Sequence, residues 1–108
     1  MENFIKKLKF NNDGLICAIA QDYKTNEILM QAWMSIQSIK ITQETGFATY
    51  FSRSRNSLWK KGETSKNTQE VIEIIADCDC DCLILKVKQN GVACHTGARS
   101  CFFNKYKI

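Results

Sequence analysis

Cysteine and aspartate side chains are concentrated in two short segments of the C-terminal half. Residues 77–82 read Asp-Cys-Asp-Cys-Asp-Cys, and a second segment, residues 94–101, begins with Cys94 and His95 and ends with Cys101. Five of the six cysteines and the only histidine lie in these two segments. Carboxylates are hard ligands and thiolates are soft ligands. The pattern therefore indicates two metal ions of different character, and the fold must position the ligands of each.

Length and composition favour a single cytosolic domain over residues 1–108. The chain has 44% hydrophobic and 24% charged residues, enough for a modest core. It has no apolar run of membrane-spanning length and no N-terminal signal segment, which predicts a cytoplasmic protein without a membrane partner. In the cytosol its cysteines are expected to be ligands or free thiols; a secreted disulfide scaffold is the alternative. The net charge of +4 leans toward an anionic partner.

Apolar runs and turn signals predict an α+β fold of mostly antiparallel strands with one or two helices. The first strand is expected over residues 15–21, with Cys17 as a small core residue, and a turn over residues 22–26. Ser35 is expected to cap a helix that ends at Gly46. The other expected strands cover residues 27–33, 47–53, 71–76, 82–89 and 102–103.

The three aspartates suit a hard divalent cation. If residues 77–81 continue as an extended chain, Asp77, Asp79 and Asp81 share one side and the cysteines share the other. Carboxylates at such short separations repel each other unless a cation neutralises them, and magnesium fits such a site. A solvated acidic turn between strands is the alternative.

The cysteines suit zinc, which in catalytic sites has three protein ligands and an open position. Cys94 and Cys101 flank a glycine-containing turn and can converge on one ion, with Cys78 as a third ligand. Spacing alone also permits a structural four-cysteine site that uses Cys80 or Cys82. His95 adjoins Cys94 and is better suited to proton transfer than to the same ion, although a structural role is the alternative.

Residues 52–65 are rich in basic and hydroxyl side chains and can form a phosphate cradle. Trp59 can stack on a ring or pack in the core, and a solvated basic loop is the alternative for the whole segment. The expected substrate-binding residues are Arg53, Arg55, Trp59, Lys60, Glu63, Thr64 and Ser65.

Four blocks of the chain resemble the phosphoribosyl-AMP cyclohydrolase family of histidine biosynthesis. They are Ala-Ile-Ala-Gln-Asp at 18–22, Ser-Arg-Ser-Arg to Lys-Lys-Gly-Glu-Thr-Ser at 52–65, Asp-Cys-Asp-Cys-Asp at 77–81, and Ala-Cys-His-Thr-Gly to Ser-Cys-Phe at 93–102. The resemblance implies a hydrolase that adds water at C6 of the adenine ring and opens its N1–C6 bond. Zinc would activate the water and His95 would manage a proton.

The resemblance also implies ligands and an assembly. Asp77, Asp79 and Asp81 match the family's magnesium ligands, and Cys78, Cys94 and Cys101 match its zinc ligands, with one ion of each kind per subunit. The zinc site of the family is shared between two subunits, which implies an intertwined homodimer. Lys66 stands where the family commonly has glycine, and Cys80 and Cys82 are additional thiols. No pyrophosphohydrolase domain, which some relatives carry, is expected here.

Two other classes of protein compete with an enzyme. A small zinc-dependent module that binds nucleic acid would use Trp59 and the basic segment, but the aspartates would repel phosphate. A thiol redox protein would need a Cys-x-x-Cys motif, which the sequence lacks. These considerations favour the enzyme with a small-molecule substrate and no nucleic-acid partner.

Overall fold

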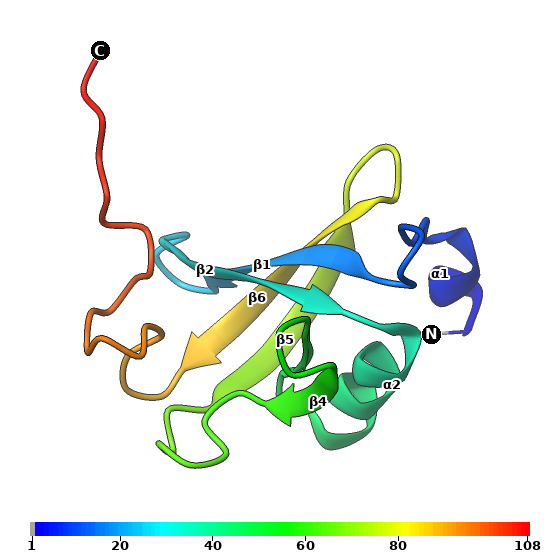
Figure 1. The fold of residues 1–108 in the computed structure, drawn as a ribbon, viewed down its shortest axis with the longest axis horizontal. Helices are drawn as coiled ribbons and strands as arrows, with labels where there is room; N and C mark the ends of the chain where they lie inside the picture. The colour runs from blue at the N-terminus through cyan, green and yellow to red at the C-terminus, as the bar shows by residue number, and fades with distance from the viewer. Residues whose placement is uncertain (1) are drawn as a thin grey trace.

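The computed structural model describes residues 2–108 and contains one six-stranded sheet with two helices (Figure 1). The elements in chain order are α1 (Glu2–Lys7), β1 (Ile16–Asp22), β2 (Ile28–Met34), α2 (Ile36–Thr45), β3 (Thr49–Ser52), β4 (Ser57–Lys60), β5 (Gln69–Ala76) and β6 (Cys82–Gln89). The α+β prediction is confirmed. Neither helix in this part of the chain is long and apolar enough to span a membrane.

The sheet has the order β4-β3-β2-β1-β6-β5. Only β1 and β6 pair in parallel; the remaining neighbours are antiparallel, as predicted for most of the sheet. The sheet curls so that its β5 edge approaches the chain just before β3. There Phe47 bridges Glu70, and the Ala48 N–H donates to the Gln69 carbonyl at 2.9 Å. This contact nearly closes the sheet on itself.

The core fills the inside of the curled sheet. Burial alternates along β1 and along β6, so that every second side chain faces inward. Leu83, Leu85 and Val87 of β6 are fully buried against Ile39 of α2 and Tyr50 of β3. The Tyr50 hydroxyl donates to Gln69 Oε1 at 2.6 Å, so the one polar group of this ring is satisfied inside the core.

Helix α2 begins and ends where its capping residues predict. The Ser35 hydroxyl accepts from the Ser38 N–H, and the Ser35 N–H donates to the Ser38 hydroxyl. Gly46 adopts the left-handed conformation with φ of 80° and closes the helix. The turn expected over residues 22–26 is also confirmed by a hydrogen bond from the Asn26 N–H to the Asp22 carbonyl.

The structure corrects the expectation for residues 52–65. This segment contains strand β4, which pairs with β3 as a hairpin and places Trp59 opposite Tyr50. Asn56 supplies the left-handed turn residue with φ of 50°. Strand β4 lies at the edge of the sheet, where one face and the unpaired edge of the strand contact solvent. Its polar composition therefore resembles that of a loop.

Residues 77–81 are not extended, which overturns the arrangement expected for the aspartates. The Cys80 N–H donates to the Asp77 carbonyl, the Asp77 N–H donates to the Cys82 carbonyl, and Cys80 has φ of 58°. These bonds close a turn between β5 and β6. The backbone therefore adopts the alternative conformation, an exposed acidic turn.

Two smaller predictions are wrong. Residues 102–103 form no strand within the described chain, because the C-terminal segment leaves the sheet (Figure 1) after the Cys101 N–H bonds to β2. Both phenylalanines are exposed. Cys17 is half-buried instead of lying in the core, because β1 turns its odd-numbered side chains away from the interior.

Gly62 is required at the start of the loop that follows β4, whereas Gly14 is required less strictly. Both have positive φ, but a Cβ on Gly62 would stand 2.5 Å from backbone atoms of Asn67 and Thr68, and a Cβ on Gly14 meets nothing within 4 Å.

We therefore expect Gly14→Ala to lower the free energy of unfolding by about 1 kcal/mol and Gly62→Ala to lower it by about 3 kcal/mol or more. Urea unfolding of both variants measures the two losses. Because both glycines have positive φ, the backbone strain of an alanine is common to the two variants and cancels when the losses are compared. Equal losses would contradict the close approach at Gly62.

Candidate active site

The loop after β6 brings Cys94 and Cys101 together. The Ala93 N–H donates to the Arg99 carbonyl at 3.0 Å, and the Cys94 N–H donates to the Ala98 carbonyl at 3.1 Å. These bonds fold residues 93–99 into a tight turn that brings the two cysteines close enough for each thiol to affect the pKa of the other. Cys94 is buried and Cys101 is half-buried. Two soft donors are thus already paired within one chain.

The two thiols differ in acidity. The pKa of the Cys94 thiol is lowered, chiefly because the Thr96 hydroxyl donates to its sulfur at 3.0 Å. Burial raises the pKa of the Cys101 thiol to about 11, and the adjacent Cys94 adds to that rise. Cys94 is therefore the thiol that ionises first, and Cys101 needs a cation to become a thiolate at neutral pH.

Lys61 supplies a positive charge beside the thiol pair. Only 9% of this residue is exposed. Burial lowers the pKa of its ammonium group, while the neighbouring Cys101 and Cys94 oppose that shift. Sequence reasoning placed Lys61 in the basic segment but did not select it as a site residue. The available signal was its spacing: Lys61 lies two residues after Trp59, just beyond the end of β4, and alternate residues of a strand point to the same face.

The predicted substrate-binding residues surround a cavity next to this lysine. The cavity has a volume of about 210 Å³, and Lys61 and Gly62 complete its wall. The predicted residues that line it are Arg55, Trp59, Lys60, Glu63, Thr64 and Ser65. Arg53 lies outside this cavity and lines a neighbouring hollow that shares Trp59; its guanidinium lies 4.7 Å from the centre of the Trp33 ring.

The acidic turn between β5 and β6 gathers its carboxylates at the surface. Asp77, Cys78, Asp79 and Asp81 are all exposed. Asp77 Oδ1 accepts from the N–H groups of Asp81 and Cys82 at 3.0 and 3.2 Å. The pKa of Asp81 is raised, first by a hydrogen bond with Asp77 and then by the negative charge of that residue. The turn is therefore a site of like-charge repulsion that a cation would relieve.

The acidic turn and the cysteine loop lie at opposite ends of β6 (Figure 1). A strand of eight residues is on the order of 25 Å long, so Cys78 and the Cys94–Cys101 pair are far apart within one chain. Among residues 2–108, no three His, Cys, Asp or Glu side chains stand together as a metal-binding group. His95 is exposed in the turn beside Cys94.

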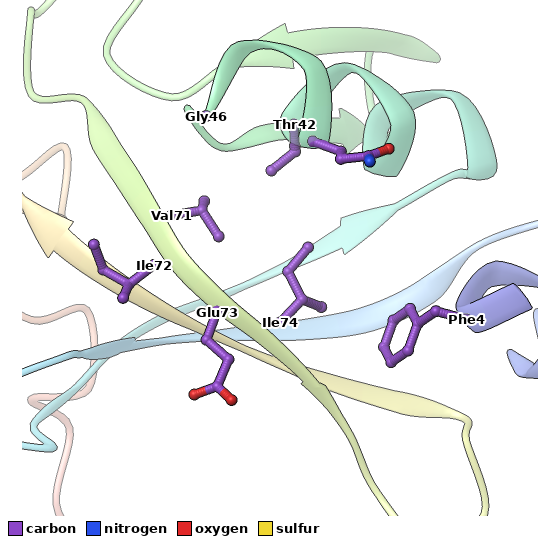
Figure 2. A pocket seen from close by; sticks show the side chains of 8 residues that line it. Phe4, Thr42, Gly46, Val71, Ile72, Glu73 and Ile74 are labelled. Atoms are coloured by element: carbon purple, nitrogen blue, oxygen red, sulfur yellow. The ribbon is translucent and has the colours of Figure 1, made fainter. Parts of the chain in front are cut away.

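A larger cavity, of about 430 Å³, lies elsewhere, between α1, α2 and β5. Figure 2 shows Phe4, Val71 and Ile74 around this hollow, with the Glu73 carboxylate directed away from α2. None of the predicted site residues lines it.

Comparisons with known proteins agree with the resemblance seen in the motifs. The model of the family described as phosphoribosyl-AMP cyclohydrolase matches residues 30–103. The chain belongs to this family. The phosphoribosyl-AMP cyclohydrolase of Trichormus variabilis is 58% identical over 97% of this chain and 91% of its own length. That of Archaeoglobus fulgidus is 57% identical over 92% of both chains.

Family membership confirms the predicted enzyme class and favours it over a nucleic-acid-binding module or a redox protein. A third relative, the phosphoribosyl-AMP cyclohydrolase of Chlorobaculum tepidum, is 52% identical over 96% of this chain and 76% of its own length.

Lys66, the expected departure from the cyclohydrolase pattern, has φ of 67°. This left-handed conformation is one that glycine adopts freely. The loop around the cavity therefore keeps the backbone that a glycine would favour, and the Lys66 N–H donates to the Gly62 carbonyl at 2.8 Å.

Arg99 ties the cysteine loop to the β1–β2 turn. Its Nη2 lies 3.1 Å from Asp22 Oδ1, and its Nε lies 2.7 Å from Glu27 Oε1. The Cys101 N–H also donates to the Leu29 carbonyl at 2.7 Å. The pKa of Asp22 is lowered, chiefly by the Thr25 N–H that donates to it, with Lys24 and Arg99 adding to the effect and burial opposing it.

Because the folded pKa of Asp22 lies below the unfolded value near 4, its stabilisation is complete above the unfolded pKa and disappears as pH falls through the folded one. We expect Asp22→Asn to lower the free energy of unfolding at pH 7 by about 1–2 kcal/mol and to weaken the acid dependence of stability. Urea unfolding from pH 7 to pH 3 measures both effects.

The control is Glu27→Gln, which removes the more exposed partner of Arg99 and is expected to cost under about 1 kcal/mol. An Asp22→Asn variant as stable as Glu27→Gln, with an unchanged acid profile, would contradict this role of Asp22.

Proposed function

We propose that this chain catalyses the family reaction, the hydrolytic opening of the adenine ring of phosphoribosyl-AMP at its N1–C6 bond, in histidine biosynthesis. The observation that carries the proposal is the thiol pair with buried Lys61 beside a cavity lined by basic and hydroxyl side chains, in a member of this family. A cytoplasmic location is part of the same proposal.

The reaction needs one water molecule and the management of one proton. Water adds to C6, the N1–C6 bond breaks, and the departing N1 receives a proton as the amide of the product forms. N1 carries the second phosphoribosyl group and is cationic, which makes C6 electrophilic. His95, exposed beside Cys94, is the proposed carrier of this proton.

Zinc is the proposed metal of the thiol pair. Cys94 and Cys101 are soft donors, their thiols lie close enough to affect each other's pKa, and the Cys94 pKa is lowered, so the donor chemistry fits. Zinc bound there supplies Lewis-acid chemistry for the attacking water. Lys61 favours ionised thiols by its charge, and the bonds of Thr96 and Arg99 keep the loop in its binding geometry.

The third zinc ligand is proposed to be Cys78 of a second copy of the chain. Cys78 is exposed on the turn before β6, and the thiol pair lies after the other end of β6, so one chain does not close the site. A symmetric homodimer would form two identical sites, each with Cys78 from one subunit and Cys94 and Cys101 from the other. Intertwining of the subunits follows from this exchange of ligands.

The acidic turn is the proposed magnesium site, one per subunit. Its hard carboxylate donors are exposed, and the pKa of Asp81 is raised by its hydrogen bond with Asp77 and by the negative charge of that residue, a repulsion that a cation would relieve. Magnesium retains several waters and binds through few carboxylates, so a preformed cage is unnecessary. Asp77, Asp79 and Asp81 are the ligands that we propose.

The phosphates of the substrate are proposed to bind along the cavity beside Lys61. Arg55 and Lys60 offer charge there, Thr64 and Ser65 offer hydroxyls, and Glu63 can accept from a ribose hydroxyl. Arg53 lies in the neighbouring hollow and suits the second phosphate. Trp59 lines both hollows and offers a ring face to the base.

Cys101→Ala should lose zinc and reduce turnover of phosphoribosyl-AMP by roughly a hundredfold or more, because a first ligand is removed. Cys80→Ala should keep its zinc and its turnover, because we assign no ligand role to the Cys80 thiol. Zinc content and optical assays on the same samples measure the two effects. Equal losses in the two variants would refute the ligand assignment.

Sharing of the zinc site can be tested with mixed dimers. A heterodimer of one Cys78→Ala chain and one Cys101→Ala chain contains one intact site if ligands are shared, and we expect about half of wild-type turnover per dimer. Co-expression with two different tags and tandem purification yields this species. A heterodimer as inactive as the two parent homodimers would refute a site built from two chains.

A further inference from the structure

Strands β1 and β6 bring Cys17 and Cys82 together at a place outside both proposed metal sites. The two residues are direct partners in the parallel ladder. Neighbouring strands lie about 4.8 Å apart, and partners in register point to the same face of the sheet. Disulfides form across Cα separations of about 4.4–6.8 Å. The backbone therefore holds these two cysteines at a separation that a disulfide accepts.

The side chains of this pair meet in a setting that small molecules can reach. Burial raises the pKa of the Cys82 thiol to about 11 and the neighbouring Cys17 adds to that rise, while Gln31 Nε2 donates to Cys17 Sγ at 3.3 Å. Both cysteines are half-buried free thiols. Cys17 also lines a cavity of about 400 Å³ together with Trp33 and Asp81. The pair is thus close together and open to an oxidant on one side.

We propose that Cys17 and Cys82 form a redox modification site that closes to a reversible disulfide by exchange with a low-molecular-weight disulfide such as oxidised glutathione. One thiolate attacks the small disulfide, forms a mixed disulfide and releases one small thiol. The second cysteine then attacks the protein sulfur and releases the other small thiol. Two protein thiols are oxidised, one small disulfide is reduced to two thiols, and the two protein protons are taken up by these products.

The disulfide would anchor one end of the acidic turn. Cys82 directly follows Asp81, and its N–H donates to Asp77 Oδ1 at 3.2 Å. The new bond would join this end of the turn covalently to β1. Cys80 is the nearest competitor, but it lies within the turn, where its carbonyl accepts from the Lys9 N–H at 2.8 Å. We therefore expect Cys82, and not Cys80, to react with Cys17.

Peptide mapping of the zinc-loaded protein after treatment with oxidised glutathione tests this pairing. Trypsin combined with a protease that cleaves before aspartate releases Cys17 in residues 13–21 and Cys82 in residues 81–86. Cys78 and Cys80 fall into separate dipeptides. We expect a cross-linked species of 13–21 with 81–86, which disappears on reduction by dithiothreitol, and a higher Tm of the oxidised protein.

The matched variants are Cys80→Ser, which should keep the cross-link and the Tm shift, and Cys17→Ser, which should lose both. A cross-link of Cys17 to a Cys78 or Cys80 dipeptide would overturn the proposal. So would wild-type protein in which Cys17 and Cys82 are both still alkylated by iodoacetamide after glutathione treatment. The primary test is the peptide mapping of the wild-type chain, so it remains valid even if Cys17→Ser does not fold.

Discussion

The parallel pairing of β1 with β6 positions every cysteine-bearing segment of the molecule. Six consecutive residue pairs join these strands in the interior of the sheet, and the inward side chains of β6 are fully buried. A strand held in this way cannot bend to bring its two ends together. The acidic turn at one end and the cysteine loop at the other are therefore fixed apart, and the proposed zinc site, which uses both, would need two chains.

The chemistry at the cysteine loop depends on unequal environments for two similar side chains. A hydroxyl donor and a nearby ammonium favour the Cys94 thiolate, whereas burial disfavours the thiolate of Cys101. A metal bound at the proposed site would meet one thiol that ionises readily, and it would have to offset the burial that opposes ionisation of the second. Arg99 and Cys101 anchor this loop on the β1–β2 hairpin, so the site depends on the same strands as the core.

Local patterns predicted the α+β class, five of the six strands and α2, because apolar runs and the Ser35 and Gly46 caps act over a few residues. The edge strand β4 was missed because its polar composition reflects solvent on its outer side. The acidic turn was expected only as the alternative to an extended chain, because Cys80, the residue that takes the left-handed conformation, has no turn preference. The Cys94–Cys101 pairing followed from spacing, but the burial of Lys61 depends on tertiary contacts that no local pattern records.

The pairing of β1 with β6 also sets the order in which the chain can fold. A contact such as that between Lys86 and Gln21 spans 65 residues, so β6 must be synthesised before β1 gains its second neighbour. The β1–β2 and β3–β4 hairpins are local and can form early, while the middle of the sheet pays a large loop-closure entropy. On the ribosome, β1 would therefore wait as an exposed edge until nearly the whole chain has emerged.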